Sequence, residues 1–326
     1  MHYRTLGNSG LMVSTVGIGC NAFGARVDAD GVARIVDAAL DAGVTLFDTA
    51  DSYSRGESET LLGRALGKRR DEVVVATKFG MDLDGLNGPD FGVRGSRRYI
   101  RRAVEASLRR LGTDYIDLYQ LHTPDRVTPL QETLAALNDL VRDGLVRYLG
   151  CSNMQAWEVV DAHWLAESLG AEHFVSAQNE YSLYNRAAEN ELAPACEHLG
   201  VGILPYFPLA HGLLTGKYRR GEQAPEGSRL SASSQASRLR SADFDTVEAL
   251  ERFACARGIS MLDLAIGGLA AQPAVGSVIS GVSKPEQVSA NAAAAEWEPT
   301  PGDLEALDAA VPRGSGPGYA TFATAR

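Results

Sequence analysis

From residue 15 onward, apolar runs of strand length alternate with helical patterns, and this alternation constrains the fold more than any other feature of the chain. Eight strand–helix units with right-handed crossovers favour an α/β fold of the closed (β/α)₈ type, the TIM barrel, over an open doubly wound sheet. Functional side chains then belong at the carboxyl ends of the strands. The expected strands cover residues 16–19, 45–48, 73–78, 116–122, 146–151, 175–178, 202–205 and 275–280, and the expected helices cover 30–43, 57–67, 97–111, 129–143, 155–169, 188–199 and 285–294.

The segments outside this alternation define the expected organisation of the chain. Residues 3–14 hold two short apolar stretches around Gly7-Asn-Ser-Gly10, a turn composition that predicts a β-hairpin plugging one end of the barrel. A chain of 326 residues suits one α/β-barrel domain. We therefore expect a single domain over 1–326, with the barrel in 15–295 and a C-terminal helix and tail in 296–326. Residues 80–96, 217–241 and 312–326 are long loops at the rim and candidate lids.

Composition argues against several classes of partner. The net charge of −10, with only short basic stretches, argues against nucleic acid and anionic lipid. No window approaches 18 uninterrupted apolar residues, so we expect no membrane span, and the N-terminus lacks a secretory pattern, which indicates the cytoplasm. Cys20, Cys151, Cys196 and Cys255 lack the spacing of a metal or redox motif, which predicts packed, reduced thiols. No feature indicates a homo-oligomer, and none excludes one.

Four ionisable residues stand at or just beyond the ends of three consecutive expected strands. Asp48 ends the second strand and Tyr53 follows it, Lys78 ends the third, and His122 ends the fourth. Adjacent parallel strands lie roughly 5 Å apart, so these side chains can share one small pocket. Each residue alone has an ordinary structural explanation, such as a loop cap or an exposed charge. Their joint placement favours an active site.

These four residues suit carbonyl chemistry. An ammonium beside a phenol stabilises the phenolate, so Lys78 should lower the pKa of Tyr53 toward the operating range. Asp48 can supply the counter-charge that a partly buried Lys78 needs, and His122 can donate a hydrogen bond to a carbonyl oxygen. The set can bind, polarise and protonate a carbonyl, but no member can supply a hydride. A cofactor is therefore required.

At these residues the chain resembles the aldo-keto reductase superfamily, most of all its prokaryotic and potassium-channel β-subunit branch. The resemblance covers about residues 3–295 and nearly the whole chain. The motifs that carry it are Phe47-Asp-Thr-Ala-Asp-Ser-Tyr53, Gly56-Glu-Ser-Glu59, Ala76-Thr-Lys78, the stretch 108–122, Gly150-Cys-Ser-Asn153, Gln178-Asn179, and the stretches 205–218 and 281–291.

The resemblance implies a catalytic tetrad and an NADPH/NADP⁺ cofactor, with neither metal nor flavin. The tetrad is Asp48, Tyr53, Lys78 and His122, with Tyr53 as the general acid in reduction. Ser152, Asn153 and Gln178 are implied to hold the nicotinamide carboxamide, Tyr206 to stack on the ring, and Arg229 to reach the 2′-phosphate. The implied pyrophosphate-wrapping residues are Phe207, Leu209, Gly212, Leu214, Gly216 and Lys217, and those at the adenosine end are Gly281, Ser283, Gln287 and Asn291.

The substrate is a small-molecule carbonyl whose identity the sequence leaves open. Phe23, Met81 and Phe91 lie in or near rim loops and are candidates for an apolar substrate pocket. The leading interpretation is an NADPH-dependent reductase of aldehydes or ketones. The alternatives are a redox-sensing NADP(H)-binding interaction protein, similar to channel β-subunits, and a Schiff-base aldolase acting through Lys78.

Overall fold

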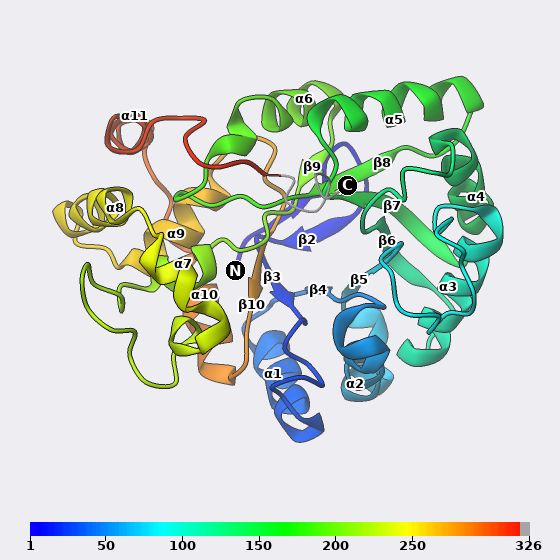
Figure 1. Cartoon of the computed structure of the whole chain (residues 1–326), viewed down its shortest axis with the longest axis horizontal. Coiled ribbons are helices and arrows are strands. Elements are labelled where there is room, and N and C mark those ends of the chain that lie inside the picture. Colours follow the sequence, from blue (N-terminus) through cyan, green and yellow to red (C-terminus); the bar gives the residue numbers. More distant parts are fainter. Residues whose placement is uncertain (320–326) are drawn as a thin grey trace.

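The central element of the computed structural model, which describes residues 1–319, is one curved sheet of eight parallel strands (Figure 1). Residues 320–326 of the expected tail lie outside the described residues. The strands pair in the order β10-β3-β4-β5-β6-β7-β8-β9. Their bounds are β3 (Val16–Gly19), β4 (Leu46–Asp48), β5 (Val74–Phe79), β6 (Ile116–Leu121), β7 (Val146–Ser152), β8 (Phe174–Gln178), β9 (Gly202–Ile203) and β10 (Val278–Gly281).

Backbone hydrogen bonds close this sheet into a barrel. The Ile203 N–H donates to the Ala274 carbonyl at 2.6 Å, and the Gly276 N–H donates back to the Ile203 carbonyl at 2.8 Å. These bonds join β9 to the segment that leads into β10, so the two ends of the strand order meet. The expected (β/α)₈ barrel is confirmed. The last expected strand, 275–280, forms regular ladder structure only from Val278.

Helices surround the sheet and present apolar faces to it (Figure 1). Several begin at side-chain caps: Asp28 accepts from the Gly31 N–H at 2.9 Å before α1, and Ser96 accepts from the Tyr99 N–H before α3. The helix expected over 188–199 begins as a turn at Ala187–Glu189, followed by α6. The helices are α1 (Ala29–Asp41), α2 (Glu57–Leu66), α3 (Arg97–Leu111), α4 (Leu130–Arg142), α5 (Ala156–Leu169), α6 (Leu192–Leu199), α7 (Ala236–Arg240), α8 (Phe244–Ala256), α9 (Met261–Ala270), α10 (Pro285–Ala294) and α11 (Pro301–Ala310).

Within residues 1–319, no single helix is long and apolar enough to cross a membrane. Only α8 and α9 taken together reach the length and apolarity of a span, and the chain bends by 94° between them. Most of α9 is buried inside the protein.

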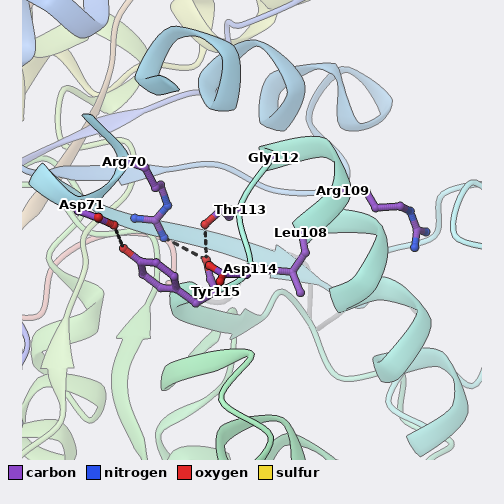
Figure 2. A pocket seen from close by; sticks show the side chains of 8 residues that line it. All are labelled: Arg70, Asp71, Leu108, Arg109, Gly112, Thr113, Asp114 and Tyr115. Atoms are coloured by element: carbon purple, nitrogen blue, oxygen red, sulfur yellow. Dashed lines mark hydrogen bonds between the residues drawn. The ribbon is translucent and has the colours of Figure 1, made fainter. Parts of the chain in front are cut away.

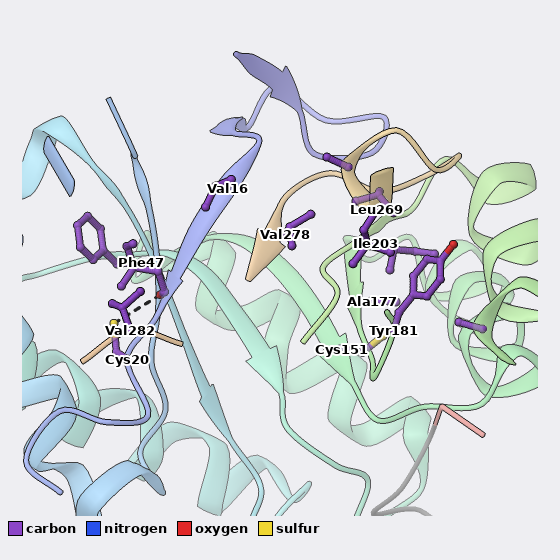
Figure 3. Close-up of a cluster of buried hydrophobic side chains, with 14 of the residues drawn as sticks. Val16, Cys20, Phe47, Cys151, Ala177, Tyr181, Ile203, Leu269, Val278 and Val282 are labelled. Carbon is purple, nitrogen blue, oxygen red and sulfur yellow. Dashed lines mark hydrogen bonds between the residues drawn. The ribbon is translucent and has the colours of Figure 1, made fainter. Parts of the chain in front are cut away.

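The hydrophobic core has two parts. The larger part lies between sheet and helices, and Figure 3 shows some of it, including Val16, Phe47 and Val278. The smaller part lies at the other side of the strands, where the N-terminal hairpin contributes to it. This hairpin, formed by β1 (Tyr3–Thr5) and β2 (Met12–Ser14), confirms the expected one. Its members are Leu6, Leu11, Val13, Leu46, Ala76, Leu118, Leu204 and Ile279.

The hairpin lies at the amino-terminal end of the barrel. The Ser14 N–H donates to Thr45 Oγ1 just before β4, and the Asn8 N–H donates to the Gly200 carbonyl just before β9. With this end plugged by apolar side chains, the carboxyl ends of the strands form the open end.

The contact between α2 and α3 gives a test of the packing. A Cβ added at Gly63 would overlap the carbonyl oxygen of Leu111 and lie 2.6 Å from its carbonyl carbon. Because that obstacle is backbone, Gly63→Ala should lower the free energy of unfolding by about 1–3 kcal/mol. Gly302→Ala on α11 is the control, since its nearest obstacle lies 3.9 Å away. Urea unfolding of both variants measures the difference, and equal stabilities would contradict the close α2–α3 contact.

Candidate active site

The Lys78 ammonium is the centre of the site and is fully buried. Its Nζ donates to Asp48 Oδ2 at 2.6 Å, to the Thr49 carbonyl at 2.9 Å and to Tyr53 Oη at 3.3 Å. An ammonium has three donors, and here each has one acceptor. The side chain is therefore fixed by β4 and by the turn that follows it, and it presents a positive charge to the Tyr53 phenol.

Asp48 is held on its other oxygen by two amides. Gln120 Nε2 donates to Asp48 Oδ1 at 3.1 Å, and Gln178 Nε2 donates to the same oxygen at 2.8 Å. These amides come from β6 and β8, so side chains from four strands converge on one buried ion pair. Sequence reasoning did not select Gln120. The signal was present, because Gln120 lies two positions before His122 and so on the same face of the expected strand.

The environment shifts three pKa values. Burial would lower the pKa of Lys78, but Asp48 and Tyr53 more than offset it and the pKa is raised. Burial raises the pKa of Tyr53, and the Lys78 ammonium opposes that shift only in part. The expectation that Lys78 brings the Tyr53 pKa down is thus wrong for the net shift, although the Lys78 effect has the expected sign. Burial, and then Lys78, hold the pKa of His122 well below its usual range, so the imidazole is neutral.

Tyr53 and His122 face each other at the base of the site. Their ring centroids lie 6.1 Å apart with an interplanar angle of 83°. The turn after Tyr53 is tight, because Ser54, Arg55 and Gly56 have φ values of 50°, 54° and 86°. Ser54 Oγ donates to the Phe23 carbonyl at 2.8 Å and stabilises this turn.

A cleft of about 720 Å³ leads away from these two rings along the carboxyl ends of the strands. It brings together three of the four predicted catalytic residues, most of the predicted cofactor residues and one predicted substrate residue. Lys78 lies behind them, in contact with Tyr53. The predicted residues that line the cleft are Asp48, Tyr53, Met81, His122, Ser152, Asn153, Gln178, Tyr206, Phe207, Leu209, Gly212, Lys217, Arg229, Gly281, Ser283 and Gln287.

Near the rings, the cleft wall is a hydrogen-bonded set of amides and hydroxyls. Asn153 Nδ2 donates to the His122 carbonyl and to Ser152 Oγ, both at 3.0 Å. Ser152 Oγ donates to the Gln178 carbonyl at 2.8 Å, and Tyr206 Oη donates to Asn153 Oδ1 at 2.8 Å. These hydrogen bonds connect the end of β7 to the end of β8 and to the chain after β9, and they hold the three segments in place.

The other end of the cleft is basic. Lys217, Arg229 and Arg26 line it, and the Arg229 guanidinium lies 5.3 Å from the centre of the Phe207 ring. Burial, followed by the nearby Arg26 and Arg238, lowers the pKa of Arg229. Within residues 1–319 no carboxylate forms an ion pair with these three cations, and such a cluster is a suitable environment for phosphate oxygens.

His211 also lines this basic end, and its Nε2 lies 3.0 Å from Arg238 of α7. Since arginine can only donate, the imidazole accepts. Burial, then Arg238 and Arg229, lower the pKa of His211 to about 4, so the ring stays neutral near pH 7. This contact ties the segment 217–241 to the cleft wall.

Besides Lys78, five predicted residues do not line the cleft. The Phe23 side chain is fully buried, and its backbone carbonyl accepts the hydrogen bond from Ser54 Oγ. Phe91 is 84% exposed in a turn, where its φ is 53°. The Phe23 ring packs into the core and the Phe91 ring faces solvent, so a part for either in substrate binding stays a prediction. Leu214 and Asn291 are buried, and Gly216 ends the turn at 210–215. A part for these three in cofactor binding stays a prediction.

Sequence reasoning also missed residues that do line the cleft, among them Asn21, Arg26, Gln235 and Ser280. Asn21 and Arg26 follow the first barrel strand, and the rule that the rim carries function could have found them. Gln235 could not be found this way, because the path of the segment 217–241 depends on tertiary packing.

A second hollow of about 520 Å³ lies at the other end of the barrel, where β6 begins (Figure 2). Its polar groups bond one another. Tyr115 Oη donates to Asp71 at 2.6 Å, and Arg70 donates to the Tyr115 carbonyl at 3.1 Å and forms an ion pair with Asp117. These bonds anchor the loop after α2 to β6, and the hollow contains none of the four predicted catalytic residues.

The comparisons with known proteins agree with this geometry. The model of the aldo/keto reductase family matches residues 15–312. A probable voltage-gated potassium channel subunit beta from Oryza sativa is 36% identical over 95% of this chain and 97% of its own length. Versiconal hemiacetal acetate reductase from Aspergillus parasiticus is 34% identical over 98% and 99%. The aldo-keto reductase dtxS3 from Metarhizium robertsii is 38% identical over 77% and 75%. The chain therefore belongs to the aldo/keto reductase family.

Proposed function

We propose that this oxidoreductase reduces an aldehyde or ketone to an alcohol with NADPH, and that Tyr53 is the general acid. One observation carries the proposal: a buried ammonium bonded at once to Asp48 and to Tyr53, with the neutral His122 facing the phenol. This arrangement can bind a carbonyl oxygen and compensate the charge that appears when the phenol gives up its proton.

The cleft has polar and cationic groups that suit a phosphorylated dinucleotide. Ser152, Asn153 and Tyr206 offer oxygen acceptors for the nicotinamide end, since their donors already bond groups of the cleft wall. Lys217 and Arg229 offer positive charge for the phosphates. Ser280 lines the same cleft, and its buried Oγ has no hydrogen-bond partner among the described residues, so a polar ligand would satisfy it. When bound, the dinucleotide supplies the hydride.

The chain's own residues perform the proton chemistry. His122 and the Tyr53 hydroxyl donate hydrogen bonds to the carbonyl oxygen. As the carbonyl carbon gains a hydride, the Tyr53 proton moves to the developing alkoxide and leaves a phenolate. Lys78 stabilises that phenolate, and Asp48 keeps Lys78 charged. The raised Tyr53 pKa keeps the phenol protonated between turnovers near pH 7.

The same geometry argues against a Schiff-base aldolase. A nucleophilic lysine must lose its proton, but the pKa of Lys78 is raised and all three of its donors are engaged. A redox-sensing interaction protein remains the second candidate, favoured by the relatives that are named as channel β subunits. Turnover separates the two candidates, because a sensor binds NADPH and reduces carbonyls slowly or not at all.

Titration of intrinsic NADPH fluorescence tests the cofactor part of the proposal. Lys217→Met should raise the dissociation constant for NADPH about tenfold, because a charged contact to phosphate contributes roughly 1.5–3 kcal/mol. Lys68→Met is the matched control, since Lys68 is an exposed lysine outside the cleft. Equal dissociation constants for the two variants would contradict the phosphate end proposed here.

A further inference from the structure

The chain beyond α11 returns to the barrel on the β8 side (Figure 1). Its last described residue, Tyr319, is buried and makes three hydrogen bonds. Tyr319 Oη accepts from the Ala156 N–H at 3.1 Å, and the Tyr319 carbonyl accepts from Asn179 Nδ2 and from the Glu180 N–H, both at 3.3 Å. One residue thus contacts the segment after β7 and the segment after β8.

Those two segments carry the amides of the cleft wall. Ala156 lies three residues after Asn153, and Asn179 directly follows Gln178. Asn179 Nδ2 also donates to the Met154 carbonyl at 3.0 Å, and the Asn179 carbonyl accepts from the Tyr206 N–H at 3.0 Å. Tyr319 therefore bonds the backbone next to Asn153 and next to Gln178, the two parts of the cleft wall at the proposed nicotinamide end. Tyr319 itself does not line the cleft.

A buried arginine holds the tail in this position. Arg186 is fully buried, and its guanidinium donates to Glu189 at 2.7 Å, to Asp308 of α11 at 2.6 Å and to the Val311 carbonyl at 2.5 Å. Burial opposes its charge, but Glu189 and Asp308 outweigh burial and raise the pKa of Arg186. The backbone N–H of Arg186 also donates to the Ser315 carbonyl at 2.6 Å.

Two asparagines extend the same attachment toward Tyr319. Asn190 Nδ2 donates to the Gly314 carbonyl at 2.9 Å, and Asn185 Nδ2 donates to the Gly318 carbonyl at 2.6 Å. The loop after β8 therefore binds the tail along residues 311–318 through side chains that bond its backbone. Ordering a glycine-rich segment costs conformational entropy, and these hydrogen bonds offset that cost. So many bonds to one segment indicate that the position of the tail matters to the protein.

We propose that Tyr319 is a positioning residue for cofactor binding: it holds Asn153 and Gln178 in place from behind the cleft wall, and Arg186 presents it by fixing the tail. The inference rests on the proposed function. The ring and its hydroxyl fix the segment after β7, and the carbonyl fixes the segment after β8. Loss of the Tyr319 side chain should loosen the first of these segments and weaken NADPH binding without removing any group that touches the cofactor.

The test compares Tyr319→Ala with Tyr319→Phe and with Tyr3→Ala. Tyr3 is the control, because its hydroxyl also bonds a backbone group, the carbonyl of Gly43, but at the amino-terminal end of the barrel. NADPH dissociation constants come from fluorescence titration, and stability comes from urea unfolding. Tyr319→Ala should raise the dissociation constant about tenfold, equivalent to roughly 1.4 kcal/mol. Tyr319→Phe should raise it less, and Tyr3→Ala should leave it unchanged whatever it does to stability.

An unchanged dissociation constant in Tyr319→Ala would overturn the inference. If the wild-type protein binds no NADPH, the proposed function fails, and amide hydrogen exchange then tests the positioning role alone. Exchange of residues 153–156 should accelerate in Tyr319→Ala and stay at the wild-type rate in Tyr3→Ala. Equal exchange in all three proteins would show that the tail positions nothing.

Discussion

Tyr53→Phe is expected to reduce turnover of a carbonyl substrate by at least about 100-fold, the usual loss when a general acid is removed. The substitution deletes one oxygen, whose bond within the described residues is to Lys78 Nζ. The ring, its contact with His122 and the amide wall remain, so the dissociation constant for NADPH should not change. Single-turnover kinetics with a saturating carbonyl measure the chemical step directly.

The control for Tyr53→Phe is Tyr119→Phe. Tyr119 is fully buried in β6, and its hydroxyl has no hydrogen-bond partner in residues 1–319. This variant loses the same atom from the same barrel and should keep wild-type turnover. A normal rate in Tyr53→Phe would remove Tyr53 from the mechanism, whereas an equal loss in both variants would indicate a general effect of the missing hydroxyl on the barrel.

Lys78→Met is expected to abolish activity and to destabilise the protein. It removes the cation that stabilises the Tyr53 phenolate, and it leaves Asp48 as a buried carboxylate whose remaining side-chain donors, within the described part of the chain, are two amides. Breaking a buried ion pair in this way costs about 3–5 kcal/mol. Urea unfolding and turnover measure the two losses separately.

The double variant Asp48→Asn, Lys78→Met separates charge balance from catalysis. It has no unpaired buried charge, so most of the lost stability should return while activity does not. Recovery of activity in the double variant would mean that Lys78 serves only to neutralise Asp48.

The pH dependence gives a further test of the Lys78 role. Because the ammonium lowers the pKa of Tyr53 against the effect of burial, its removal should move the alkaline limb of any residual activity to higher pH. The pKa of Lys78 itself is raised above its ordinary value of 10.5, so the stability it contributes is present below that value and is lost as the pH rises through the raised pKa. An alkaline limb that does not move in Lys78→Met would contradict the electrostatic role.

The sequence predicted the barrel because eight apolar runs of strand length alternate with helical patterns, and it predicted the site because three of these runs stop at a polar residue. Asp48, Lys78 and His122 were found by that rule, and the structure brings them together with Tyr53. The net pKa shift of Tyr53 could not be predicted, since it depends on how deeply the phenol is buried. The direction of the Phe23 ring could not be predicted for the same reason: its place in a rim loop is visible in the sequence, but the inward direction of its ring is not.

Contacts between distant segments were also beyond the sequence. The tail was expected only as a candidate lid, yet the described part bonds the backbone N–H groups of Ala156 and Glu180, just after Asn153 and Gln178. The Arg186 bonds to Asp308 and Val311 join residues more than a hundred positions apart. No local propensity or periodicity encodes such pairings, because they arise only once the barrel has closed and α11 has docked.

The most direct test of the central claim is the absorbance of reduced nicotinamide when the purified protein is mixed with NADPH and a panel of aldehydes, ketones and sugar carbonyls. The proposed chemistry predicts that absorbance falls with at least one carbonyl and that Tyr53→Phe abolishes most of the fall. Binding of NADPH with no loss of absorbance across the panel would contradict the reductase assignment and favour the sensor.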